Sequence, residues 1–165
     1  MRLGAGFPVW VLRGGIVVAV GLIVLLLRTQ HVAALPVLAI ATFGILSALA
    51  PASPAPAFVI AATAVSAATS GTNPFALSML ALLPLIHLVH IGSAISATVP
   101  ATARLHLVAL GPAALRFVVV QASVFAIAGV AAIVPATVTP TALEVAGLAG
   151  VAVLAALAAR LVTKR

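Results

Sequence analysis

Long apolar runs with short breaks between them constrain this chain more than any other feature. The breaks are made of Pro, Gly, Thr and Asn, residues that commonly separate helices. A water-soluble fold needs polar residues to cover its surface, yet this chain of 165 residues is 65% hydrophobic and only 5% charged. The sequence therefore predicts an integral membrane protein, all-α in class, with a single transmembrane domain over residues 1–165.

Six apolar segments are candidates for membrane spans. An α-helix needs about 20 apolar residues to cross the hydrocarbon core of a bilayer, which is roughly 30 Å thick. The predicted spans are residues 8–27, 32–50, 56–69, 75–99, 112–134 and 141–162. The third segment has only about 14 residues, a length that is also typical of a re-entrant hairpin.

The positions of the cations favour six spans over five, because cytoplasmic loops carry an excess of Lys and Arg. With six spans and a cytoplasmic N-terminus, seven of the eight cations lie inside and only Arg28 lies outside. Without the third span, two lie inside and six outside. Arg strongly outnumbers Lys, which fits a GC-rich bacterial coding sequence. We therefore predict a six-span protein of the bacterial cytoplasmic membrane with both termini in the cytoplasm.

Two histidines interrupt the fourth segment within the stretch PLIHLVHIGS, residues 84–93. His87 and His90 lie one helical turn apart near the middle of the span, where an ionisable group must be neutral or paired. We predict a neutral, hydrogen-bonded polar cluster with Gln121 or with hydroxyl groups of neighbouring helices. The functional alternative is the polar site of a small transporter, which needs a midplane cavity lined by these three side chains.

Metal and haem sites are incomplete within one chain. Residues i and i+3 project from the same side of a helix, whereas a haem iron takes its axial ligands from opposite sides. Zinc needs at least one ligand besides His87 and His90, yet the chain has no Cys and its one acid, Glu144, is predicted near the outer surface. We expect no cofactor and no metal in a single chain. The alternative is metal or haem binding in a homodimer, where two copies supply four imidazoles.

The remaining polar residues are predicted at the ends of the spans. Glu144 and Arg28 are expected to form an ion pair at the outer face. A cytoplasmic basic loop, which contains Arg104, His106 and Arg116, is expected to form a short interfacial helix against anionic lipid headgroups. The cations form no run typical of nucleic-acid binding, so nucleic acid is not an expected partner.

A resemblance to a known group covers residues 83–122, LPLIHLVHIGSAISATVPATARLHLVALGPAALRFVVVQA. In its apolar pattern, its paired histidines and its Arg-containing loop, this stretch resembles small uncharacterised actinobacterial membrane proteins encoded beside MoxR-type ATPases. The resemblance implies a partnership with that ATPase system and no known activity. In size and helix count, the chain also resembles the substrate-binding components of energy-coupling-factor vitamin transporters.

From these features we expect an accessory or scaffold subunit of a membrane complex. The expected partners are membrane lipids and either other membrane subunits or further copies of the chain. No catalytic constellation is visible, so we expect no enzymatic activity. A small transporter or substrate-binding subunit is the alternative. A scaffold exposes an apolar surface and encloses no polar cavity, whereas a transporter encloses a polar cavity near the membrane midplane.

Overall fold

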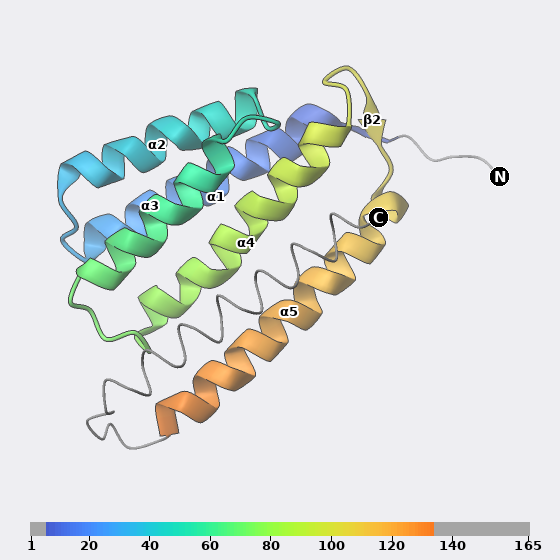
Figure 1. Ribbon diagram of the computed structural model, residues 1–165. Helices are drawn as coiled ribbons and strands as arrows, with labels where there is room; N and C mark the ends of the chain where they lie inside the picture. Colours follow the sequence, from blue (N-terminus) through green and yellow to red (C-terminus); the bar gives the residue numbers. More distant parts are fainter. Residues whose placement is uncertain (1–5, 134–165) are drawn as a thin grey trace, which may run out of the picture. The chain divides into compact units, whose positions relative to one another are not determined.

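The computed structural model describes residues 6–133, which are mostly helical (Figure 1). Residues 6–131 belong to one compact unit. The predicted sixth span, residues 141–162, lies outside the described residues. In chain order the elements are β1 (Phe7–Pro8), α1 (Val9–Thr29), α2 (Ala34–Leu49), α3 (Ala55–Thr69), α4 (Leu77–Thr98), β2 (Arg104–Leu105) and α5 (Leu107–Ile133).

Three of the described helices, α1, α4 and α5, are long and apolar enough to cross a membrane. They have 21, 22 and 27 residues. The helices α2 and α3 have 16 and 15 residues. At 1.5 Å per residue these two are only about 24 and 22 Å long, which is shorter than a typical hydrocarbon core. The apolar helical architecture is confirmed, while the second and third predicted spans are helices shorter than an ordinary membrane span.

The core of the unit lies along one face of α1. Its buried side chains recur every three or four residues, which places them on one stripe of the helix. This stripe consists of Ile16, Ala19, Val20, Ile23 and Leu27, and it packs against α2, α3 and α4. At Gly44 the backbone of α2 approaches α1 so closely that an added Cβ would overlap the side chain of Val20. Glycine at this position therefore permits close packing of the two helices.

The helix α1 ends in a Schellman cap. The backbone N–H of Val32 donates to the carbonyl of Leu27 at 3.1 Å, and the N–H of His31 donates to the carbonyl of Arg28 at 3.1 Å. His31 adopts the left-handed conformation that this cap requires, with φ 59°. The cap turns the chain into α2 and leaves Arg28 and His31 exposed.

A two-stranded antiparallel ribbon joins the chain before α1 to the loop after α4. Phe7 of β1 lies opposite Leu105 of β2, and the N–H of Val9 donates to the carbonyl of Ala103 at 3.3 Å. The start of α1, the end of α4 and the start of α5 therefore lie at one end of the unit (Figure 1). We call this end, which contains β1 and β2, the ribbon end.

The loop before α5 differs from the sequence prediction. An interfacial helix followed by a span starting at Pro112 was expected, but β2 occupies Arg104–Leu105 and α5 begins at Leu107 with Pro112 in its interior. The ribbon pairing uses the backbone of β2, so this segment cannot also be helical. The proline removes one helix hydrogen bond, to the carbonyl of Val108, and the helix continues through it.

Candidate functional site between α4 and α5

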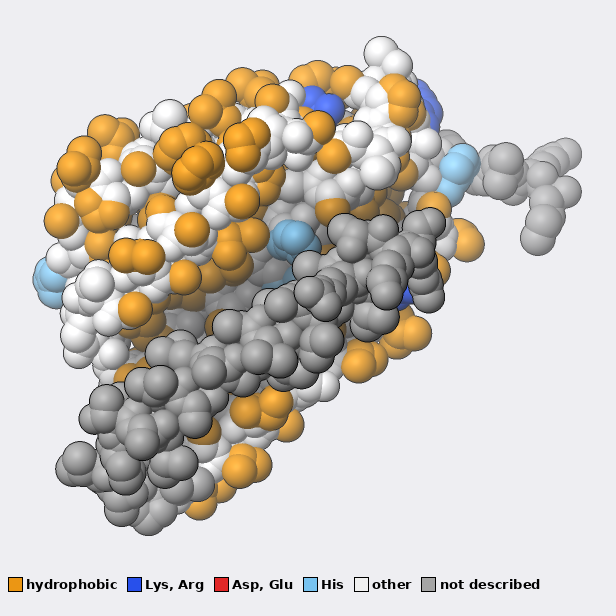
Figure 2. Space-filling model, viewed as in Figure 1, with side chains coloured by type: hydrophobic (Ala, Val, Ile, Leu, Met, Phe, Trp, Pro, Cys, Tyr) orange, Lys and Arg blue, Asp and Glu red, His pale blue; other side chains and the backbone are white. Residues whose placement is uncertain are grey.

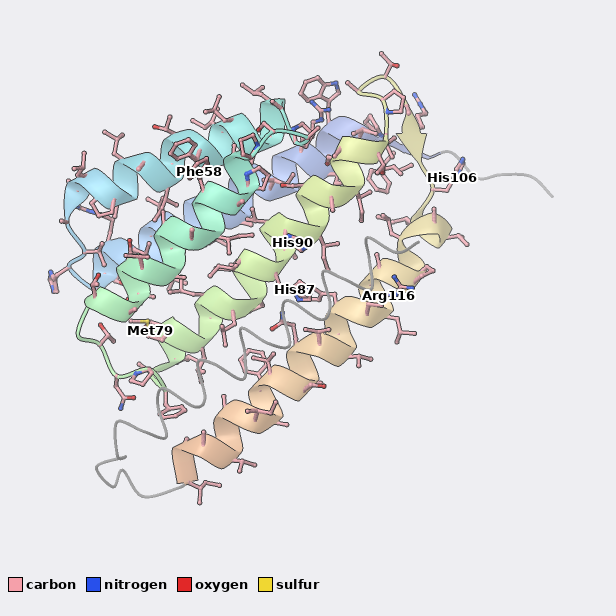
Figure 3. All side chains as sticks on the ribbon, in the orientation of Figure 1. Phe58, Met79, His87, His90, His106 and Arg116 are labelled. Atoms are coloured by element: carbon pink, nitrogen blue, oxygen red, sulfur yellow. The ribbon has the colours of Figure 1, made fainter. Side chains whose placement is uncertain are left out.

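A polar pair links the middle of α4 to the middle of α5. His87 extends from α4 toward α5 (Figure 3), and its Nδ1 atom lies 2.7 Å from Nε2 of Gln121. Because an amide nitrogen only donates, this arrangement makes Nδ1 of His87 the acceptor. Gln121 is 8% exposed and is the one residue that α5 buries among its described positions.

An aromatic ring covers one side of this pair. Phe117, one helical turn before Gln121, lies with its ring centroid 5.0 Å from that of His87, at an interplanar angle of 30°. The other amide atom, Oε1 of Gln121, is buried and accepts no hydrogen bond from the part of the chain that the structure describes. His87 and Gln121, two of the three residues of the predicted polar cluster, lie within hydrogen-bond distance of each other, and this contact joins α5 to a neighbouring helix with which it has otherwise sparse contacts.

His90 lies in a different environment from His87. It is exposed, and it lines a cavity of about 470 Å³ together with Ser93 and residues of the α2–α3 loop and α3, including Ser53 and Ala57. Neither His87 nor Gln121 lines this cavity. The structure therefore brings together two of the three predicted cluster residues. The third, His90, faces another space.

The cavity beside His90 contains one buried hydroxyl group. Ser93 is 2% exposed, and its Oγ has no hydrogen-bond partner within residues 6–133. The same residues include no group of three or more His, Cys, Asp or Glu side chains that could hold a metal ion. The donors and acceptors on this part of α4 are thus an imidazole and a hydroxyl, which suit hydrogen bonding to a small polar molecule.

The predicted basic loop is divided between two elements. Arg104 lies in β2, His106 directly precedes α5, and Arg116 lies within α5. The Lys and Arg side chains visible on the face in Figure 2 lie toward the ribbon end. Arg28 lies in the last turn of α1, at the opposite end. Its predicted partner, Glu144, lies outside the described residues.

Arg13 has a structural role that the sequence did not reveal. It is 9% exposed, and its Nη1 donates to the carbonyl of Leu49 at 3.3 Å, at the last residue of α2. Its guanidinium also lies 5.0 Å from the ring centroid of Trp10. A cation is stabilised at a helix C-terminus, where backbone carbonyls lack partners. The only sequence signal was a cation close to the start of an apolar helix.

Comparisons with known protein families, with curated proteins and with solved structures find no match to this chain. Its function is therefore inferred from its own residues and their geometry.

Proposed function

We propose that the chain is a multi-pass accessory or scaffold subunit of a complex in a bacterial cytoplasmic membrane. The observation that carries this proposal is the surface of α5. Only Gln121 is buried among its 27 residues, and Leu115, Ile127 and Val130 are 66–70% exposed. A helix that is apolar on all sides is typical of surroundings made of lipid or of other apolar helices.

The exposure of the side chains differs between one stripe of α5, which we call the inner seam, and the rest of the helix, which we call its outer faces. Half-buried or buried positions recur every three or four residues along one stripe of the helix. They are Leu110, Ala113, Phe117, Gln121, Val124 and Ala128. The remaining faces are exposed and carry large apolar side chains, and apolar side chains also cover much of the face in Figure 2. These outer faces are the surface that we propose for neighbouring subunits, either further copies of the chain or other proteins.

We further propose six spans with both termini in the cytoplasm. The ribbon agrees with this topology, because pairing of β1 with β2 requires an even number of crossings between Phe7 and Leu105. Four crossings by α1 to α4 meet this condition, and so do two by α1 and α4 alone. The distribution of cations supports the orientation. Arg13, Arg104 and Arg116 lie nearer the ribbon end, whereas Arg28 lies at the opposite end. The likeness of residues 83–122 makes a MoxR-type ATPase the candidate partner on the cytoplasmic side.

A crosslinking experiment tests the scaffold proposal. The chain contains no Cys, so single cysteines report on single positions. Ile127→Cys lies on the exposed face of α5, and Val124→Cys, three residues earlier, lies on the inner seam. We expect a short bifunctional crosslinker in native membranes to join Ile127→Cys to a further subunit and to leave Val124→Cys unlinked. If neither variant is crosslinked to another subunit, the scaffold function is contradicted.

The cavity beside His90 and Ser93 favours a second candidate function, the binding of a small polar substrate. Ala57 also lines this cavity and is exposed, so a cysteine there reports on access of water. Labelling of Ala57→Cys by a membrane-impermeant maleimide that is applied to intact cells, from the side opposite the α2–α3 loop, would favour a transporter or substrate-binding subunit. If Ala57→Cys is labelled only after detergent has dissolved the membrane, the result would favour the scaffold.

A further inference from the structure

A second cavity lies where α1 passes into α2 and where α3 ends, at the end of the unit opposite the ribbon end (Figure 1). Its volume is about 320 Å³, close to the lower limit of the range of about 300–1,000 Å³ that small-molecule sites span. The described residues that line it include no Lys, Arg, Asp or Glu. Because no charged side chain faces it, the cavity suits a small uncharged molecule.

The amide of Gln30 indicates the chemistry of this cavity. Gln30 lines the cavity and is the C-cap residue of α1. Its Nε2 and Oε1 atoms are both buried, and neither makes a hydrogen bond within residues 6–133. An unpaired buried amide is unfavourable, and no hydrogen bond from the described chain holds this one in the cavity wall. The last torsion of a glutamine has a broad energy profile, so the amide can turn to meet a ligand.

Other polar groups around the cavity come from α3 and from the cap of α1. Ser66 and Thr69 of α3 both line it, and Thr69 donates its hydroxyl hydrogen to the carbonyl of Val65 at 2.9 Å. The Thr69 oxygen therefore remains an acceptor. The imidazole of His31 adds a further hydrogen-bonding group. The apolar part of the wall consists of Val32, Ala33, Pro36 and Val65.

We propose that this cavity binds a small uncharged carboxamide, and that the amide of this ligand pairs with the amide of Gln30. Gln30 presents one donor and one acceptor in a single plane, and a second amide supplies the matching acceptor and donor. A hydroxyl group donates and accepts through one atom, so it matches this arrangement less well. A carbonyl compound without N–H groups leaves Oε1 of Gln30 unpaired. The apolar body of the ligand lies against Val32, Pro36 and Val65.

Benzamide and acetophenone are matched probes, because they have nearly the same shape and differ in the NH₂ group. The purified full chain in mild detergent is dialysed to equilibrium against each probe, with empty micelles as the baseline. We expect saturable binding of benzamide to the wild type, about fivefold tighter than binding of acetophenone. Gln30→Leu should weaken the binding of benzamide about tenfold and remove this preference.

The neighbouring residue provides a matched control. Thr29 is exposed, does not line the cavity and donates its hydroxyl hydrogen to the carbonyl of Leu26 at 2.7 Å. Thr29→Val should therefore bind both probes like the wild type. Gln30→Leu replaces an unpaired buried amide with an apolar side chain, so its free energy of unfolding should be no lower than that of the wild type.

Three outcomes would overturn the proposal. The first is equal binding of benzamide and acetophenone by the wild type, or unchanged binding of benzamide by Gln30→Leu. The second is saturable binding of neither benzamide nor the smaller isobutyramide, which would show that the cavity holds only water. The third is a lower free energy of unfolding in Gln30→Leu, which would assign Gln30 a structural role. The measurements use the purified chain alone, so their outcome does not depend on the proposed scaffold function.

Discussion

The substitution His87→Leu tests the polar pair between α4 and α5. It removes the acceptor of the amide of Gln121, which is 8% exposed and whose Oε1 already lacks a partner in the described part of the chain. A buried polar group left unpaired costs about 1–3 kcal/mol, and side-chain hydrogen bonds between membrane helices contribute about 0.6 kcal/mol on average. We therefore expect His87→Leu to lower the free energy of unfolding by about 1–2 kcal/mol.

A double-mutant cycle separates this pair from general packing. Replacing both residues, His87→Leu with Gln121→Leu, removes donor and acceptor together and should cost less than the sum of the two single substitutions. His90→Leu is the matched control. It lies one turn away on the same helix but is exposed, and the hydrogen bond of Gln121 is made with His87, so its effect should stay within about 0.5 kcal/mol.

The assay is reversible unfolding of the purified chain in mixed micelles, with helicity followed by circular dichroism. The expected coupling energy between His87 and Gln121 is about 0.5–1.5 kcal/mol. Additive single substitutions, or a cost for His87→Leu no greater than that for His90→Leu, would refute the argument that this pair holds α5 to α4.

The same unfolding assay checks two further predictions. Gly44→Ala should cost about 1–3 kcal/mol because its Cβ overlaps α1, whereas Gly21→Ala, with open space around it, should stabilise the helix by up to about 1 kcal/mol. His31→Gly should stabilise the chain by about 1 kcal/mol because it removes left-handed strain, and His31→Val should destabilise it. The purified wild type should contain no zinc, copper or haem. Stoichiometric metal or haem that is lost on replacing His87 and His90 with Leu would indicate a dimeric site.

The bounds of the described helices were largely predictable from the sequence. The first predicted span, residues 8–27, corresponds to α1 at Val9–Thr29, and the fourth, residues 75–99, corresponds to α4 at Leu77–Thr98. These bounds depend on local features, namely apolar runs and the Pro and Gly residues between them. The ribbon was not predictable in this way, because two-residue strands pair residues about 100 positions apart and leave no periodic pattern.

The candidate site was predictable only in part. A contact between His87 and Gln121 followed from their depth, since polar side chains in the middle of apolar helices need partners. The separation of His90 from this pair did not follow from the sequence. Three residues advance a helix by about 300°, which turns His90 about 60° away from His87, and only the positions of α3 and α5 decide what each histidine faces. The contact of Arg13 with Leu49 likewise depends on where α2 ends.

The most direct test of the proposed membrane topology is the accessibility of three single cysteines. Ala33, Ala52 and Thr102 are exposed residues in the loops after α1, α2 and α4. In intact cells, a membrane-impermeant maleimide should label Ala33→Cys only. Ala52→Cys and Thr102→Cys should become labelled only when the cytoplasmic side is opened. Labelling of Ala52→Cys from outside would show that α2 and α3 do not cross the membrane, and labelling of Thr102→Cys from outside would contradict the six-span topology.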